Sequence, residues 1–212
     1  MQYKIFLASK SSNFRLILKS QKLFTFSLFS RLKVVNDIFN NFKFFNFINS
    51  AEKFHIALNL KYPTFLQVFS YFYITKSKGS CLFFDSPNIY VKCLHSLYNS
   101  SVSPIVEFKS DKFSFGFRPY RDCQDFFLEI KNFFLNNKKD FSCLNLKLVS
   151  VLNFFSNDWL IKNFPLEKRI LKSWLNNNLL FSYSFSENKV YPFIGFTSIY
   201  NTFFNFLLNG LL

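Results

Sequence analysis

Glycine, histidine and acidic residues are scarce in this 212-residue chain, and each shortage excludes a class of site. The four glycines form no Gly-rich loop, which excludes the phosphate-binding loops of the nucleotide-binding folds. Four cysteines contain no Cys-x-x-Cys pair, and Cys93 with His95 is a weak metal motif. His55 and His95 lie in no recognisable nucleophile motif, so we interpret both as structural. We expect no metal or other cofactor, and reduced thiols that are mostly buried.

The shortage of acidic residues is greatest at the N-terminus. Against 26 Lys and Arg stand 12 Asp and Glu, a formal net charge of +14, and no acidic residue precedes Asp37. This excess indicates a polyanionic partner, with nucleic acid considered first and an anionic membrane second. A basic, Ser-rich, acid-free N-terminus is also typical of an organelle transit peptide. We prefer a folded basic element here. The remaining alternative is a generally Lys-rich surface.

Apolar residues make up half of the chain, which is enough for a core in one large domain or two small lobes. Residues 190–212 carry no charge, but Pro192 and Gly195 interrupt them and asparagines recur at every fourth position. We therefore expect a buried C-terminal helix and no membrane insertion. The patterns elsewhere predict helices over residues 13–36, 85–97, 120–137, 159–163 and 165–175, a hairpin over 74–84, and strands over 143–152 and 181–194.

Two predicted helices carry distinct faces. Arg15, Lys19 and Lys22 recur at i, i+4 and i+7 and form one basic stripe suited to phosphates, or otherwise a solvated helix face. The flanking apolar residues are predicted to turn elsewhere: Phe14, Ile17, Leu18 and Phe24. In residues 120–137 the apolar face is predicted to pack on the core, and it consists of Phe126, Phe127, Ile130, Phe133 and Phe134.

The stretch Phe115-Gly116-Phe117-Arg118-Pro119-Tyr120-Arg121-Asp122-Cys123 concentrates residue types that are rare in this chain. Two guanidiniums three residues apart lie around a proline that fixes φ. A glycine nearby lets the backbone approach a ligand closely. The pattern predicts a rigid phosphate-binding corner, and the alternative is an ordinary loop with surface arginines.

The same stretch resembles the Tyr-Gly-Phe-Arg-Pro-Gly-Arg-Ser-Cys signature of group II intron reverse transcriptases, the intron-encoded maturases. Ser156-Asn157-Asp158-Trp159-Leu160-Ile161 is similar to the Ser-His-Glu-Trp-Leu-Leu of that family. Further similar segments occur in the same order as in the family, and the resemblance spans roughly residues 15–212: residues 18–32, 73–79, 165–175 and 208–211.

The resemblance implies an α+β fold, with N-terminal helices followed by the fingers and partial palm of a reverse transcriptase, the thumb being absent. It implies a basic helical N-terminal region over residues 1–60 and a fingers and partial palm domain over residues 61–212. Residues carried over as contacts to RNA phosphate, or as positioning the fingers, are Arg15, Lys19, Lys22, Lys76, Lys78, Arg118 and Arg121.

The metal-binding aspartates of the family have no counterpart. The palm aspartate aligns with Lys147, and the sequence contains no Asp-Asp pair. A cation at this position repels Mg²⁺, so the resemblance implies a protein without polymerase activity. We hypothesise that Lys147 contacts RNA phosphate; the alternative is a strand lysine that points to solvent.

These observations predict an RNA-binding, maturase-like protein that assists the folding and splicing of intron RNA. The codon bias implied by the Phe-, Lys- and Asn-rich composition favours an organelle gene, in a plastid rather than a mitochondrion. Three alternatives remain: a ribosome-associated RNA-binding protein derived from a maturase, half of a split maturase whose palm a second chain completes, and a decayed reading frame.

Overall fold

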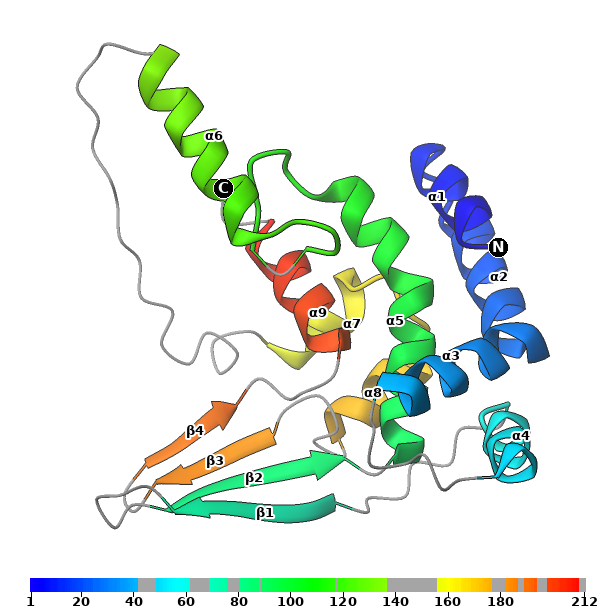
Figure 1. The fold of residues 1–212 in the computed structure, drawn as a ribbon. Helices are drawn as coiled ribbons and strands as arrows, with labels where there is room; N and C mark the ends of the chain where they lie inside the picture. Colours follow the sequence, from blue (N-terminus) through cyan, green and yellow to red (C-terminus); the bar gives the residue numbers. More distant parts are fainter. Residues whose placement is uncertain are drawn as a thin grey trace.

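Helix α5 (Ile89–Lys109) is the centre of the protein in the computed structural model (Figure 1). The structure describes residues 1–41, 49–61, 69–75, 81–87, 89–116, 118–136, 156–176, 182–186, 189–193 and 198–209. On one side of α5 lie α1 (Gln2–Lys10), α2 (Phe14–Phe26) and α3 (Leu28–Asn41), and on the other lies α9 (Ser198–Leu208). The remaining described helices are α4 (Ser50–Asn59), α6 (Cys123–Asn136), α7 (Asn157–Asn163) and α8 (Lys168–Asn176).

Local capping explains several of these boundaries. Asn13 begins α2, because its side chain accepts a hydrogen bond from the Leu16 amide at 3.1 Å. Ser27 has an extended backbone and separates α2 from α3, so the helical region predicted over residues 13–36 consists of two helices. Ser156 caps α7 in the same way, accepting from the Trp159 amide at 3.1 Å.

Helix α5 differs from its prediction at both ends. Strand β2 continues to Pro87, so the helix starts later than expected, and it runs past residue 97 to Lys109. Pro104 lies inside it and has no N–H, which leaves the carbonyl of Ser100 without its helical donor. The side chain of Gln2 donates to that carbonyl at 3.0 Å. The helix can therefore continue through the proline.

The buried side chains form one cluster built from helices and the segment between α7 and α8. Trp174 is fully buried and meets the rings of His95 at 4.9 Å and Tyr98 at 5.3 Å between centroids. Burial lowers the pKa of His95 to about 3 and raises the pKa of the Cys93 thiol to about 12. Both side chains are neutral parts of the core, as the structural interpretation of His95 predicted.

Four described strands pair two by two into antiparallel hairpins. In the first, β1 (Phe69–Thr75) pairs with β2 (Cys81–Pro87), with Thr75 opposite Cys81. In the second, β3 (Ser182–Ser186) pairs with β4 (Lys189–Phe193). The hairpin predicted over residues 74–84 is thereby confirmed, and two strands lie within residues 181–194, where strands were predicted.

The expectation of an α+β reverse-transcriptase fold with fingers and palm is wrong for the part of the chain that the structure describes. That part is predominantly helical, and its strands form only the two separate hairpins. Among the residues whose burial is described, helices and their connections supply the core. The strand predicted over residues 143–152 lies outside the described residues.

Helix α6 forms where the periodicity predicts it, but its predicted core face is not buried. None of its side chains is buried, and Phe127 is 65% exposed. In Figure 1 the helix projects away from the helices around α5. Its N-terminus is capped as expected, with the Asp122 amide donating to the Asp125 carboxylate at 2.9 Å. The pattern therefore predicted the helix correctly and its packing wrongly.

Helix α9 confirms the predicted buried C-terminal helix. Ile199 and Phe203 are buried, while Asn205 and Asn209 both donate to the hydroxyl of Ser110, at 3.0 and 2.9 Å. The asparagine face thus meets the end of α5. Among the described residues, no helix combines the length and apolar character needed to cross a membrane.

Candidate nucleic-acid interface

An open groove of about 590 Å³ lies between α2 and the start of α8, and we call it the α2–α8 groove. Four of its side chains are cationic and one is anionic, so the groove matches a polyanion. An apolar floor lies between the charged side chains. The lining residues are Phe14, Leu18, Lys19, Lys22, Leu23, Leu166, Glu167, Lys168 and Arg169.

A buried glutamine fixes the two sides of the α2–α8 groove relative to each other. The Gln21 side-chain nitrogen donates to the Pro165 carbonyl at 2.8 Å and to the Ser101 carbonyl at 3.4 Å. These bonds join α2 to α5 and to the segment that leads into α8. Since buried carbonyls need a partner, the arrangement resists sliding of α2.

The sequence analysis predicted that the basic stripe and the apolar residues of α2 lie on different faces, and the structure matches this only in part. Ile17 and Phe24 turn into the core, as expected. Phe14 and Leu18 do not turn away from the basic stripe, because they line the same groove as Lys19 and Lys22. Helical geometry explains this: positions 14, 18 and 22 are successive i+4 neighbours on one face. The stripe is therefore amphipathic rather than purely cationic.

Helix α8 supplies the other half of the positive charge. Its buried face includes Leu171 and Trp174, which leaves Lys168, Arg169 and Lys172 exposed. The first turn contains no acidic residue. Cations at a helix N-terminus are disfavoured by the helix dipole, and a bound anion would relieve that repulsion. The sequence analysis did not identify Lys168 and Arg169 as candidate contacts, although adjacent Lys and Arg residues at the start of a predicted helix were a usable signal.

Most of these charges have no partner within the described part of the chain. Lys22 meets Glu167 at 3.6 Å, and because both side chains are partly exposed the pair is weak. Lys19, Lys168 and Arg169 form no ion pair or hydrogen bond with the described residues. The α2–α8 groove thus presents cations that are free to meet an external anion.

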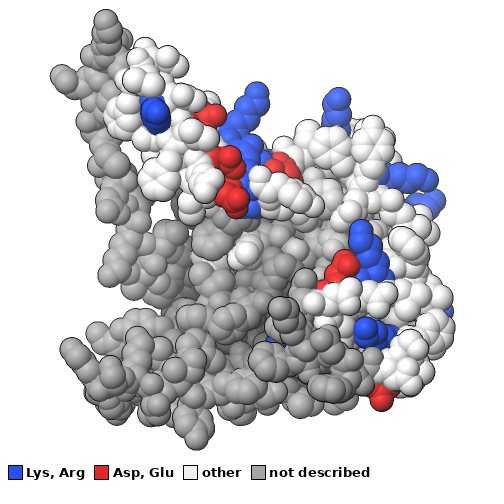
Figure 2. Space-filling model, in the orientation of Figure 1, with Lys and Arg blue, Asp and Glu red and all other residues white. Residues whose placement is uncertain are grey.

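Charge is distributed unevenly over the surface (Figure 2). Along the right edge of that view, where α1 to α3 lie in Figure 1, most charged side chains are Lys or Arg. Beside α6 the basic and acidic side chains lie together. The segment around residues 115–123, which we call the Arg-rich motif, is therefore not the most positive part of the face shown.

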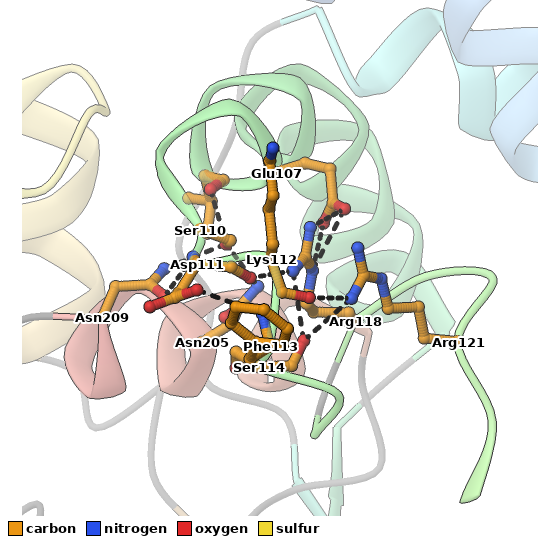
Figure 3. A network of polar contacts seen from close by, with 11 residues as sticks. Glu107, Ser110, Asp111, Lys112, Phe113, Ser114, Arg118, Arg121, Asn205 and Asn209 are labelled. Atoms are coloured by element: carbon orange, nitrogen blue, oxygen red, sulfur yellow. Dashed lines mark hydrogen bonds and ion pairs between the residues drawn. The ribbon is translucent and has the colours of Figure 1, made fainter. Parts of the chain in front are cut away.

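In the predicted phosphate-binding corner, Arg118 is engaged inside the protein (Figure 3). Its side chain is only 5% exposed. Its Nε donates to both Glu107 carboxylate oxygens, at 3.1 and 3.2 Å, and Nη2 donates to the same carboxylate. Its Nη1 donates to the carbonyls of Asp111 and Ser114. Arg118 thereby folds the segment after α5 back onto that helix.

Arg121 is half-buried in the same segment. Its Nη1 donates to the Lys112 carbonyl, and its guanidinium lies 5.1 Å from the centroid of the Phe115 ring. Both contacts hold Arg121 against its own loop. The two arginines are brought together by the structure, but as organisers of this loop rather than as an open pair of phosphate ligands.

The unusual backbone conformation of the motif occurs at Tyr120 and not at the glycine, where the sequence predicted a close approach. A Cβ added at Gly116 would meet nothing within 4 Å, so no close approach requires glycine there. Tyr120 instead has φ of 61°, a left-handed conformation that disfavours side chains. In the maturase signature that the motif resembles, glycine occupies this position.

The remaining predicted contacts divide into two groups. Arg15 is exposed on α2 but does not line the groove. Lys76, Lys78 and Lys147 lie outside the described residues.

The chain is similar to a known protein of Euglena. No protein-family model matches the chain. The chain is 26% identical over 218 aligned residues to the ribosomal operon-associated A protein of Euglena gracilis. The alignment covers 99% of this chain and 38% of that relative, so the chain spans well under half of its length.

Proposed function

We propose that this protein binds RNA through the α2–α8 groove and has no chemistry of its own. The observation that carries the proposal is the set of cations at the groove, Lys19, Lys168 and Arg169, without partners among the described residues. RNA is the polyanion that also agrees with the net charge of +14 and with the relative's name.

Two classes of RNA fit this proposal. Intron RNA follows from the maturase resemblance, and the protein would then stabilise the active fold of an intron whose RNA performs the splicing. Ribosomal RNA is favoured by the name of the Euglena relative, which links that protein to a ribosomal operon. In both cases we place the protein in an organelle, with a plastid as the first choice. Crosslinking in the organelle, followed by sequencing of the attached RNA, distinguishes intron from ribosomal RNA.

The binding site itself is tested with two variants that remove equal charge. The groove variant carries Gln at Lys19, Lys22, Lys168 and Arg169, and the control variant carries Gln at four exposed lysines that line no described pocket. RNA affinity is measured by fluorescence anisotropy over a range of salt concentrations. The control substitutions are Lys4→Gln, Lys10→Gln, Lys109→Gln and Lys131→Gln.

We expect the groove variant to bind RNA at least tenfold more weakly. Its salt dependence should fall by about 0.7 in log–log slope for each lost contact to single-stranded phosphate. The control variant should keep most of its RNA affinity and most of its salt dependence, because long-range charge alone contributes less than direct contacts. Equal losses in the two variants would mean that RNA follows net charge and not the groove.

A further inference from the structure

The floor of the α2–α8 groove is apolar, although its rim is charged. Phe14 is 52% exposed and Leu23 is 59% exposed, and both line the same groove as the cations of α2 and α8. Leu18 and Leu166 complete the floor. Apolar surface that borders cations in this way is costly to leave in water, and it matches a ligand with one anionic part and one flat apolar part.

Phe14 lines this groove from the start of α2. It is the first residue of α2, directly after the capping Asn13, so its backbone is anchored by the hydrogen bond from Leu16. No ring contact of Phe14 with another described residue occurs. This half-exposed side chain lines a groove whose volume, about 590 Å³, suits a small organic group.

A fully paired RNA helix does not match this combination. It presents phosphates and riboses outward and keeps the faces of its bases stacked inside, so an apolar floor would meet only polar backbone. An unpaired nucleotide presents both required parts, because its base face stacks on aromatic rings while its flanking phosphates bind Lys or Arg. Spacing supports this, since Phe14 and Leu18 lie beside Lys19 and Lys22 on one helix face.

We infer that the α2–α8 groove takes an unpaired nucleotide of RNA, with its base against Phe14 and Leu18 and its adjacent phosphates on the lysines and arginine of the groove. This inference rests on the proposed RNA-binding function and specifies the substrate of the same site. It assigns the protein to RNA with bulges or single-stranded segments rather than to continuous duplex.

Two RNA probes test the inference. One is a short hairpin whose two strands are fully paired and joined by a non-nucleotide linker, so that it contains no unpaired nucleotide. The other is the same hairpin with a single bulged 2-aminopurine, whose fluorescence is quenched on stacking. Three variants are compared with the wild type: Phe14→Ala, Phe14→Trp, which keeps an aromatic face, and Phe54→Ala. Phe54 is a matched control, because it is 45% exposed on α4 and lines no described pocket.

For the wild type we expect about tenfold tighter binding of the bulged hairpin, together with quenching of 2-aminopurine. Phe14→Ala should lose both the preference and the quenching while it keeps its affinity for the paired hairpin. Phe14→Trp should retain both, and Phe54→Ala should behave as the wild type. Circular dichroism confirms that each variant is folded.

Three outcomes would overturn the inference. If the wild type binds both hairpins equally without quenching, the inference fails while the RNA-binding proposal stands. If neither hairpin binds at low salt, both fail together. If poly-L-glutamate displaces the bulged hairpin at equal charge concentration, the groove selects charge alone, and the assignment to an unpaired base is wrong.

Discussion

The side chain of Gln21 donates a hydrogen bond to the carbonyl of Pro165 across 144 residues of sequence, at 2.8 Å. It joins the two walls of the α2–α8 groove, because Pro165 directly precedes Leu166 and Glu167 on the opposite wall, and the Lys22–Glu167 ion pair spans the same gap. The same nitrogen also reaches the carbonyl of Ser101 in α5. One buried amide thus links the two segments that line the groove to each other and to α5.

We predict that Gln21→Met lowers the free energy of unfolding by about 2 kcal/mol, since it leaves the buried Pro165 carbonyl without a donor at nearly constant volume. RNA affinity should fall as well, because the groove walls are no longer held in register. Urea denaturation and anisotropy provide the two measurements. A variant as stable as the wild type would show that the contact does not fix the groove.

Gln2 and Pro104 form a second coupled pair. Gln2→Ala should cost about 0.5 to 1 kcal/mol, because the Ser100 carbonyl then loses the donor that replaces the missing proline N–H. In a Pro104→Ala background the new amide can donate to that carbonyl, so the same substitution should cost less. A double-mutant cycle by urea denaturation measures the coupling. Identical costs in both backgrounds would contradict this account of how α5 continues through its proline.

Arg118 is predicted to contribute to stability rather than to RNA binding. Arg118→Lys should lower the free energy of unfolding by about 2 kcal/mol, because lysine cannot satisfy the Glu107 carboxylate and the two loop carbonyls together. The folded fraction should bind RNA within about twofold of the wild type, on the order of 0.4 kcal/mol. A tenfold loss of affinity in a variant of unchanged stability would instead make Arg118 a direct RNA contact.

Tyr120 combines a left-handed backbone with a fully exposed side chain. Tyr120→Gly should therefore raise the free energy of unfolding by about 0.5 to 1 kcal/mol, because relief of strain exceeds the added flexibility of the unfolded chain. Tyr120→Ala keeps the strain and should change stability by only a few tenths of a kcal/mol. Thermal denaturation of both variants tests this, and equal stabilities of the Gly and Ala forms would argue against strain at residue 120.

Features that depend on interactions between residues near in sequence could be predicted from the sequence. The first hairpin, the capped start of α6 and the buried helix α9 follow from turn residues, capping and periodicity. The length of α5 was not predictable, because Gln2, nearly a hundred residues away, supplies the bond that Pro104 removes.

The candidate site shows the same division. Lys19 and Lys22 were found because they repeat along one helix, whereas Lys168 and Arg169 join them only through packing between distant segments. The Arg-rich motif was misjudged for the opposite reason. Its residue types suit phosphate, but the nearby Glu107 satisfies Arg118 first, and no local pattern reveals that partner. The apolar periodicity of α6 likewise specifies a helix without specifying what covers it.

The position of RNA on the protein is measured most directly by lysine acetylation of the full chain with and without bound RNA, read by mass spectrometry. The account predicts that RNA protects Lys19, Lys22 and Lys168, which line the α2–α8 groove, and leaves Lys4 and Lys10, which are also exposed, reactive. Protection spread evenly over all five lysines, or confined to the two on α1, would contradict it.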